Sequence, residues 1–147
     1  MGVVVDSSVF VAVQRRRFDW RAFAGSLGSE ELFVTTITLS EMLHGAHRAQ
    51  TEEQREKRLR FADRLERDYR MLPFAVREAR THAALSAELQ MRGETVGAHD
   101  LLIAGIALCH GHRVVTLNVR EFSRVPGLGV VDASGFVIRE PQSKIEP

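Results

Sequence analysis

Val3-Val4-Val5-Asp6-Ser7-Ser8 is the stretch that decides the fold of this chain of 147 residues. Three β-branched apolar residues in a row, with no polar alternation, are typical of a short strand that is buried on both faces. The strand ends in an acid and two hydroxyl residues, which can cap the helix predicted from the apolar run that follows. A strand that turns straight into a helix is the first half of a βαβ unit. Open parallel sheets carry their chemistry at the carboxyl ends of their strands, where Asp6 is expected to lie.

Short strands and helices alternate along the rest of the chain. We predict further strands at residues 32–36, 71–72, 113–116 and 129–131. Helices are predicted at residues 19–27, 38–46, 51–70, 76–92 and 100–110. In the helix at 76–92, the inward positions are expected to be Val76, Ala79, Ala83, Leu85 and Leu89. The alternation indicates an α/β fold with a mainly parallel sheet. We expect one domain over residues 1–140 and a flexible tail over 141–147.

The composition is that of a soluble globular protein, with 44% apolar and 27% charged residues. The longest apolar run, from Leu101 to Cys109, is too short to span a bilayer. The first apolar run has no basic region before it and no small-residue cleavage site, so we expect no secretion signal. Cys109 is the single cysteine, which rules out an internal disulfide and a zinc site built of cysteines. We therefore expect a reduced, cytoplasmic protein without a membrane segment. The net charge of +1 decides nothing about nucleic acid.

Three carboxylates share one sequence context, an acid placed just beyond a strand or at the start of an apolar helix. Asp6 follows the first strand, Glu41 lies after the second, and Asp100 opens the helix before the fourth. Asn118 and Glu121 follow the fourth strand. In a parallel sheet the elements after the first, second and fourth strands emerge at one edge, which would bring these groups together. Asp100 joins them only if its helix starts at the same edge.

Several acids in one pocket repel one another and need a counter-ion. Oxygen ligands suit a hard cation such as Mg²⁺ or Mn²⁺. Such an ion can lower the pKa of a bound water and stabilise the charge on a phosphate during in-line attack. The sequence pattern therefore favours a metal-dependent reaction at a phosphate.

Each acid also has a purely structural interpretation. Asp6 is a favoured helix cap, and Thr38 with Glu41 fits a capping box. Asp100 can complement the positive end of its helix, an effect of about 0.3–1 kcal/mol. These interpretations do not require the three acids to lie beside one edge, which is what the metal site needs.

Four motifs of the chain resemble those of PIN-domain nucleases, and more narrowly those of the VapC toxins of toxin–antitoxin pairs. The motifs are Val-Val-Asp-Ser-Ser at 4–8, Thr-Leu-Ser-Glu-Met at 38–42, Ala-His-Asp-Leu-Leu-Ile-Ala at 98–104 and Thr-Leu-Asn-Val-Arg-Glu-Phe at 116–122. Arg-Val-Pro-Gly-Leu at 124–128 continues the match. The resemblance implies a five-stranded parallel sheet flanked by helices. It also implies Mg²⁺- or Mn²⁺-dependent endoribonuclease activity that leaves a 5′-phosphate and a 3′-hydroxyl.

Carried over residue by residue, the resemblance makes Asp6, Glu41 and Asp100 the three core metal ligands. Asn118 falls where many members of the family have a fourth acid, which is a departure. Glu121 can supply the missing charge, so both stay candidates for that position. Ser8 falls where the family often has a small hydroxyl residue, which can bond Asp6 or a phosphate.

The resemblance further implies a cognate VapB-like antitoxin that blocks the site, an RNA substrate, and a homodimer or a larger toxin–antitoxin assembly. Early apolar residues either form a groove for the antitoxin or belong to the core: Phe10, Val13, Trp20, Phe23, Leu43 and Ala46. Among the basic residues, the run Arg15 to Arg17 is the better candidate for phosphate contact, with Arg15 in a substrate-binding role. The highly charged helix at 51–70 is more typical of an ion-paired face. His99 is either a neighbour of the site or a loop residue without a role.

Alternative functions stay open at this point. A catalytically silent PIN-fold binding module would explain Asn118 as a sign of a decayed site. A stand-alone PIN nuclease would have no antitoxin. A phosphatase that uses Asp6 as its nucleophile is disfavoured, because Ser8 stands where such enzymes have a second acid.

Overall fold

Five parallel strands form the sheet of the computed structural model, which describes residues 2–139. The strand order is β3-β2-β1-β4-β5, and every neighbouring pair is parallel. The predicted α/β fold with a central five-stranded sheet is therefore confirmed. The tail predicted at 141–147 lies outside the described residues. The strands are β1 Gly2–Val5, β2 Glu31–Thr35, β3 Arg70–Leu72, β4 Arg113–Thr116 and β5 Val130–Asp132.

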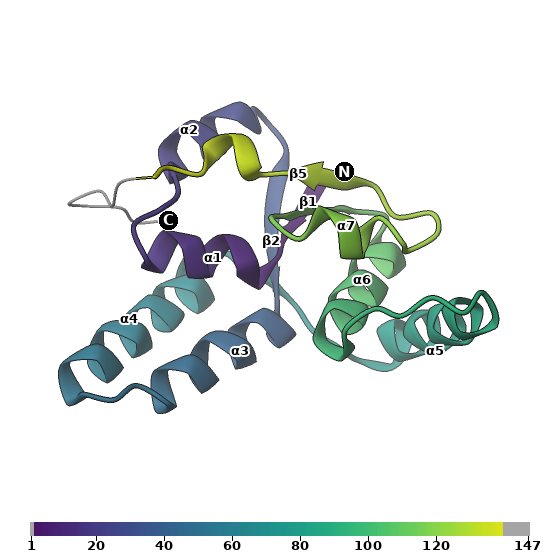
Figure 1. Ribbon diagram of the computed structural model, residues 1–147, viewed down its shortest axis with the longest axis horizontal. Helices are drawn as coiled ribbons and strands as arrows, with labels where there is room; N and C mark the ends of the chain where they lie inside the picture. Colours follow the sequence, from purple (N-terminus) through teal and green to yellow (C-terminus); the bar gives the residue numbers. More distant parts are fainter. Residues whose placement is uncertain (1, 140–147) are drawn as a thin grey trace.

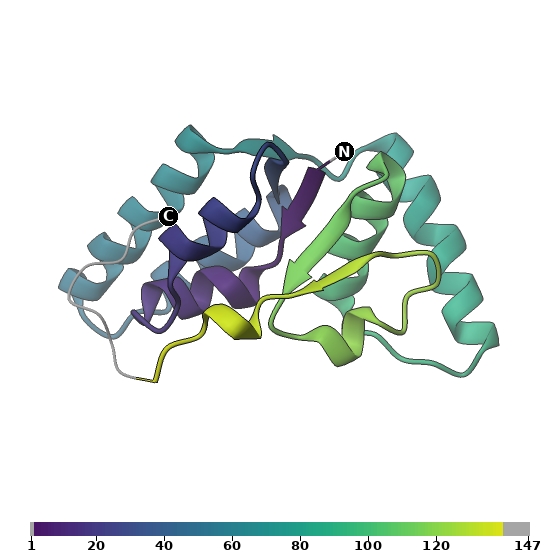
Figure 2. The same cartoon turned by 90° about the horizontal axis from the view of Figure 1, so that it is seen from above.

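Helices cover both faces of the sheet. Figure 1 shows α1 to α4 on one side of the sheet and α5 and α6 on the other. Seen from above in Figure 2, β1 and β4 lie side by side and α1 continues from the end of β1. The helices are α1 Ser7–Gln14, α2 Trp20–Ser26, α3 Thr36–His47, α4 Glu52–Asp68, α5 Val76–Met91, α6 Ala98–His110 and α7 Val119–Phe122, followed by the 3₁₀ turn η1 Ser134–Phe136.

Alternate residues of the central strand build two separate cores. Val3 and Val5 belong to the core under α1, α2 and α4, whereas Val4 belongs to the core under α5 and α6. Both sets of side chains are fully buried because the sheet is covered on each face. This explains why the first strand is apolar at every position.

The candidate apolar groove residues of the early helices belong to the first core. Phe10, Val13, Phe23 and Ala46 are buried and Trp20 is nearly so. The interpretation of this set as an exposed groove for an antitoxin is therefore wrong for these five residues. They hold α1 to α4 against the sheet instead.

Of two predicted helix starts, the cap of α1 is confirmed and the start of α3 differs from the prediction. Asp6 caps α1, accepting a hydrogen bond from the Ser8 backbone N–H at 3.4 Å. Thr35 caps α3, accepting from the Thr38 N–H at 3.1 Å, so α3 begins two residues earlier than expected. Glu41 is then in the second turn of α3. The capping-box interpretation of Thr38 and Glu41 is therefore wrong, and Glu41 is left without that structural role.

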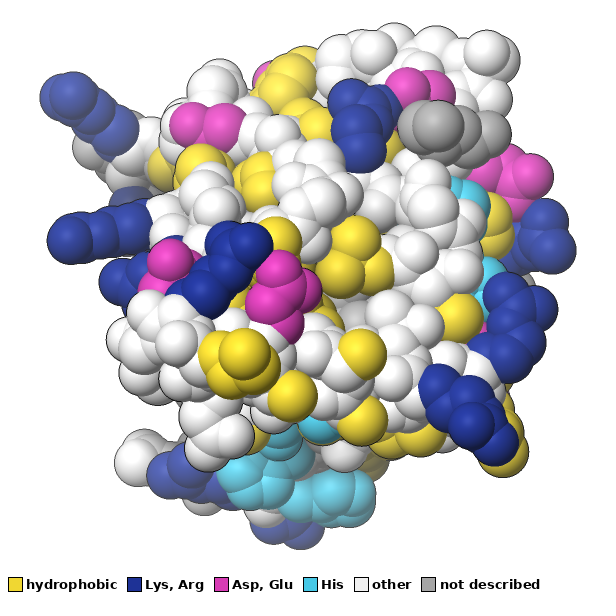
Figure 3. Space-filling model, turned by 90° about the vertical axis from the view of Figure 1, so that its right-hand side faces the viewer, with side chains coloured by type: hydrophobic (Ala, Val, Ile, Leu, Met, Phe, Trp, Pro, Cys, Tyr) yellow, Lys and Arg dark blue, Asp and Glu magenta, His cyan; other side chains and the backbone are white. Residues whose placement is uncertain are grey.

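The second long helix, α5, also differs from the prediction in its inward face. Val76 is 70% exposed and Ala83 is exposed, so the predicted inward placement of these two residues is wrong. The prediction for Leu85 and Leu89 is confirmed, and Glu78 is buried as well. Figure 3 looks onto this side of the molecule, where most basic side chains lie toward the margins and scattered hydrophobic side chains surround an acidic and a basic side chain near the centre. Within residues 2–139, no helix combines the length and the apolar character that a membrane crossing needs.

Candidate active site

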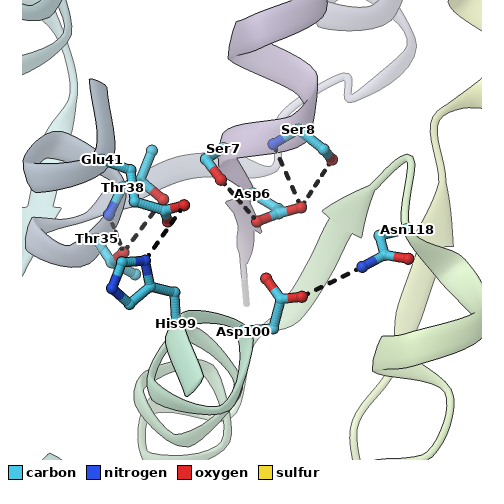
Figure 4. A network of polar contacts seen from close by, with 9 residues as sticks. All are labelled: Asp6, Ser7, Ser8, Thr35, Thr38, Glu41, His99, Asp100 and Asn118. Atoms are coloured by element: carbon cyan, nitrogen blue, oxygen red, sulfur yellow. Dashed lines mark hydrogen bonds and ion pairs between the residues drawn. The ribbon is translucent and has the colours of Figure 1, made fainter. Parts of the chain in front are cut away.

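Four elements place polar side chains at the carboxyl edge of the sheet. Asp6 follows β1, Glu41 lies in α3 after β2, and Asn118 follows β4. α6 runs back along the sheet, so its first turn carries Asp100 to the same edge. Figure 4 shows the carboxyl groups of Asp6, Glu41 and Asp100 pointing toward one shared space. The structure thus brings together the residues that the sequence singled out.

Asp6 is the most firmly held of the three acids. Its side chain is buried, with the whole residue 2% exposed. Hydroxyl groups donate to it from two directions: Ser8 Oγ at 2.7 Å and Thr116 Oγ1 at 2.8 Å, both to Oδ2, and Ser7 Oγ at 3.4 Å to Oδ1. The hydrogen bonds fix the orientation of the carboxylate and stabilise its charge. Ser8 thus bonds Asp6, as the family pattern implied.

Asp100 carries the most perturbed carboxyl group of the site. Burial is the largest cause, and the neighbouring charges of Asp6, Glu121 and Glu41 add to it, which raises the pKa of Asp100 to about 6. A hydrogen bond from Asn118 Nδ2 to Asp100 Oδ2, at 3.2 Å, acts in the opposite direction. Repulsion among these acids shows that they share one electrostatic environment.

Asn118 and Glu121 form a connected pair beside Asp100. Asn118 Nδ2 donates to Glu121 Oε2 at 2.9 Å as well as to Asp100. Glu121 Oε1 accepts from the Gly97 backbone N–H, and this bond is the largest cause of the lowered pKa of Glu121. Glu121 is therefore a stable negative charge, while Asn118 is a neutral donor between two carboxylates.

Glu41 has a less complete set of partners. Burial is the largest cause of its raised pKa, and the charge of Asp6 adds to it. Glu41 Oε2 lies 3.5 Å from Nδ1 of His99, which is in the first turn of α6. Glu41 Oε1 is buried and has no hydrogen-bond partner among the residues that the structure describes. A buried carboxylate oxygen without a partner is rare and marks a place where a ligand can be bound.

The acids face one another without forming a tight cage. Among residues 2–139, no three of these carboxylates have oxygen atoms that all lie within 4.8 Å of one another. Small side-chain rotations are therefore needed before Asp6, Glu41 and Asp100 can bind one ion.

A groove opens beside Glu41 between α1, α3 and α4, with a volume of about 590 Å³. Its walls carry one acid, Glu41, several apolar and neutral residues, and six basic side chains: Arg15, Arg16, Lys57, Arg58, Arg60 and Arg64. The ion pairs expected on α4 are present, including Arg55–Glu52 and Lys57–Glu53. The prediction of a merely ion-paired face was incomplete, because one side of α4 also lines this groove.

Two contributors to the site had no role assigned from the sequence. Thr116 is fully buried at the end of β4 and donates to Asp6, and Ser7 donates to the other oxygen of Asp6. The signal for Thr116 was available, since a hydroxyl residue at the end of a buried strand faces the same edge as the acids. Its partner on β1 could not be identified without the strand order.

The chain is similar to known proteins in both sequence and structure. A family model described as PIN domain matches residues 3–128. Ribonuclease VapC1 of Rickettsia felis is 33% identical over 134 residues, covering 91% of this chain and 98% of the relative. The tRNA(fMet)-specific endonuclease VapC of Salmonella typhimurium is 34% identical over 108 residues, covering 73% of this chain and 79% of the relative.

Solved structures of VapBC proteins also match the chain. The DNA-bound VapBC of Salmonella typhimurium has a chain that matches with a TM-score of 0.80 and 27% identity, covering 90% of this chain and 98% of that one. VapBC-1 of nontypeable Haemophilus influenzae matches with a TM-score of 0.79 and 25% identity, covering 91% and 99%. These proteins are similar to the chain in sequence and in fold over nearly its whole length.

Proposed function

Since the chain belongs to the PIN-domain family and, within it, to the VapC ribonucleases, we propose that it is the endoribonuclease toxin of a toxin–antitoxin pair. The observation that carries the proposal is the convergence of Asp6, Glu41 and Asp100 at one edge of the sheet, beside a basic groove. A purely structural set of caps does not explain this arrangement, because Glu41 caps no helix.

The residues of the site fit a hard divalent cation, and we assign Mg²⁺ or Mn²⁺ to it. The donors are all carboxylate oxygens, which these ions prefer. Among residues 2–139, Glu41 Oε1 is buried without a partner. Burial is the largest cause of the raised pKa values of Glu41 and Asp100, and the charges of the neighbouring acids add to it. In this proposal Asp6, Glu41 and Asp100 hold the ion. The chemistry that the ion supplies is the activation of water and the stabilisation of charge on a phosphate.

The protein's own groups keep the acids in place for this task. Ser8 and Thr116 orient Asp6 through their hydroxyl groups, and Asn118 orients Asp100 through its amide. Glu121 contributes a fourth negative charge. Asn118 occupies the position at which many members of the family have a fourth acid, so we assign both residues to the site. His99 positions Glu41 rather than acting on the substrate, since its ring faces that carboxylate.

The basic groove is the proposed path of the RNA. Six cationic side chains line it, and Glu41 connects it with the acidic site. Phosphate groups of an RNA strand are attracted to such a groove regardless of sequence, which positions the strand for cleavage. Arg15 belongs to this groove, in agreement with its proposed substrate-binding role.

The same proposal includes a cognate VapB-like antitoxin, because the related solved structures are VapBC complexes. It also includes a homodimer or a larger toxin–antitoxin assembly, and a single domain over residues 1–140. A toxin that cleaves cellular RNA acts in the cytoplasm, which is the localisation that we assign. Initiator tRNA is the first substrate to test, because one relative is named as a tRNA(fMet)-specific endonuclease.

Cleavage by purified, antitoxin-free protein tests the proposal directly. We expect cleavage of RNA in the presence of Mg²⁺ or Mn²⁺, loss of cleavage with a chelator, and recovery when the ion is restored. The Asp100→Asn variant should lose at least about a hundredfold in rate, because a carboxylate that binds and orients the ion is removed. Sequencing of the RNA ends identifies the cut site and shows whether the product carries a 5′-phosphate.

Asp132→Asn is the matched control. Asp132 also lies at the carboxyl end of a strand, but it is exposed and accepts a hydrogen bond from Ser134. The same chemical change at this position should leave cleavage unchanged. Equal cleavage by wild type and Asp100→Asn would contradict the proposal, and so would cleavage that is insensitive to a chelator.

A further inference from the structure

Three side chains of different chemistry converge at the opposite end of α6 from the acidic site. They are Glu78 in the first turn of α5, and Cys109 and His110 in the last turn of α6. One ligand atom from each lies within 4.8 Å of the ligand atoms of the other two. This is the one group of three or more His, Cys, Asp and Glu residues in the described part of the chain with such spacing.

We propose that Glu78, Cys109 and His110 form a second metal site, with a preference for Zn²⁺ or another borderline ion. A thiolate, an imidazole and a carboxylate are the three kinds of ligand that Zn²⁺ takes in proteins, whereas Mg²⁺ and Mn²⁺ prefer oxygen alone. Three protein ligands leave a fourth position for water. The site therefore differs from the acidic site in the ion that it selects.

The environment of Glu78 supports a role as a ligand. Glu78 is 4% exposed, and an acid is rarely so buried without a charge partner. Its Oε1 accepts from the Ala75 backbone N–H at 3.2 Å, which fixes the side chain and leaves Oε2 pointing toward His110. A hydrogen bond of this kind to a second oxygen is typical of ligating carboxylates, which are themselves held in place.

His110 provides both a ligand and an entry path. Its Nε2 lies 2.7 Å from Glu78 Oε2, so a shift of a few tenths of an ångström gives the spacing of two ligands on one ion. The His110 side chain is 22% exposed, and Cys109 is partly exposed. In the described structure, His110 is also the sole ion-pair partner of Glu78. A hydrogen bond from its own backbone is the largest cause of the lowered pKa of Glu78, so Glu78 offers a carboxylate as a ligand. A divalent ion would add a second charge partner for this carboxylate.

Binding of an ion at this site is expected to act as a clamp, that is, to link two helices through shared metal ligands. The ion would join the first turn of α5 to the last turn of α6, and these two helices already pack against each other. Asp100 and Cys109 are nine residues apart on α6, or about 14 Å along the axis. The clamp thus acts on the helix that carries Asp100, from its other end.

Cobalt titration tests the site through a signal that the acidic site cannot produce. Chelator-treated protein is titrated with Co²⁺, and we expect one equivalent to give the near-ultraviolet charge-transfer band of a thiolate bound to cobalt. Zn²⁺ should abolish the band by displacement, and Mg²⁺ in large excess should not. The same one equivalent of Zn²⁺ should raise the thermal midpoint of unfolding of the chelator-treated protein.

Three variants separate the ligands from the fold. Cys109→Ser should remove the band, and Glu78→Gln, which keeps the shape of the side chain, should weaken Co²⁺ binding by at least about tenfold, as should His110→Ala. His47→Ala is the matched histidine control, since His47 is exposed on α3, and it should change nothing. Asp100→Asn should keep the band, which makes the test independent of the proposed nuclease site.

Two results would overturn the proposal. One is the absence of a thiolate band in wild-type protein that is folded and has its thiol reduced. The other is equal Co²⁺ affinity in wild type, Glu78→Gln and His110→Ala, which would mean that Cys109 binds the metal without the other two residues.

Discussion

The amide nitrogen of Asn118 donates hydrogen bonds to Asp100 and Glu121 at once, so a neutral side chain stands between two carboxylates of the candidate site. A carboxylate at this position would have no proton to donate at neutral pH and would face both acids as a like charge. The departure from the family's fourth acid therefore reduces repulsion within the site. It also reduces the total charge that attracts a divalent ion.

Asn118→Asp is expected to change metal affinity and stability in opposite directions. Metal-free protein should lose about 1 kcal/mol in the free energy of unfolding, because two hydrogen bonds become repulsive contacts. Mg²⁺ should bind up to roughly tenfold more tightly, since an added carboxylate increases the ligand charge. Urea unfolding with a chelator and calorimetric titration with Mg²⁺ measure the two effects. Weaker Mg²⁺ binding by the variant would show that the donor function of Asn118 matters more than charge.

The raised pKa of Asp100 predicts a pH-dependent cost in stability. The pKa is about 6 in the folded protein and 3.8 in the unfolded reference, so the unfolded state releases its proton first as the pH rises. The carboxyl group therefore lowers stability progressively between about pH 4 and pH 6, and the cost is complete above that range. The unscreened cost is about 3 kcal/mol. Because the group is only half buried, we expect about 1 kcal/mol.

Asp100→Asn should accordingly stabilise the metal-free protein while abolishing cleavage. The gain in the free energy of unfolding should be about 1 kcal/mol at about pH 7 and should shrink toward zero near pH 4. Chemical denaturation at several pH values, with a chelator present, measures it. A gain that is the same at both ends of the range would mean that its cause is not the ionisation of Asp100.

At the scale of elements, α5 and α6 approach each other closely at a glycine. A Cβ atom added at Gly105 would lie 3.0 Å from the His82 Cβ and 3.2 Å from the His82 Cα. A Cβ atom added at Gly45, in the last turn of α3, would meet nothing within 4 Å. Both glycines lie within helices, so they separate the effect of packing from that of helix propensity.

This pair of glycines gives a prediction with an internal control. Gly45→Ala should stabilise the protein by about 0.5–1 kcal/mol, because alanine is the better helix former and has free space there. Gly105→Val should destabilise it by about 1–3 kcal/mol, because the side chain pushes α5 away from α6. Thermal or urea unfolding of both variants measures the difference. If both changes stabilised the protein, the close approach of the two helices would not be rigid.

The elements of the fold were largely predictable from local patterns, and their contacts were not. Apolar β-branched runs such as Val3 to Val5 and Val114-Val115 identify buried strands because no other element uses them so consistently. The sequence does not identify the inward face of α5, where Glu78 is buried and Val76 is exposed. The burial of Glu78 depends on its contact with His110, which is 32 positions away along the chain.

The candidate site, too, was predictable in its residues but not in their contacts. The acids Asp6, Glu41 and Asp100 were recognisable from their places after strands and at helix starts, together with the family motifs. The short helix α7 and the contacts of Thr116, Ser7 and His99 were not predicted, because they depend on which strands and helices become neighbours.

On the scale of the whole molecule, charge is separated although the total is nearly zero. The net formal charge is +1, yet the acids gather at the carboxyl edge of the sheet and six basic side chains line the adjoining groove. A nucleic acid responds to the local surface rather than to the sum. The composition alone therefore gave no indication of an RNA-binding surface.

Removing two positive charges from the groove should weaken RNA binding in a salt-dependent manner. We expect the double variant Arg15→Ala and Arg60→Ala, in an Asp100→Asn background that does not cut, to bind single-stranded RNA more weakly. The slope of log affinity against log salt should become less steep by about 0.7 for each lost contact. Fluorescence anisotropy at several salt concentrations measures the slope.

Arg92→Ala is the matched control for the groove, since Arg92 is exposed at the end of α5 and pairs with Glu88 at 2.9 Å. It removes one positive charge from a distant surface and should leave the slope unchanged, whereas each groove substitution is expected to reduce it. An equal effect of Arg92→Ala would point to a general charge effect rather than to a path along the groove.

The order of strands has a consequence for synthesis of the protein. β1 is made first and lies at the centre of the sheet, but its neighbour β4 follows more than one hundred residues later. Thr116 reaches Asp6 across 110 positions. A nascent chain therefore has Asp6 bonded at most to its sequence neighbours Ser7 and Ser8 until Thr116 has been made. A nuclease built in this order can complete its acidic site only when about four fifths of the chain has been synthesised.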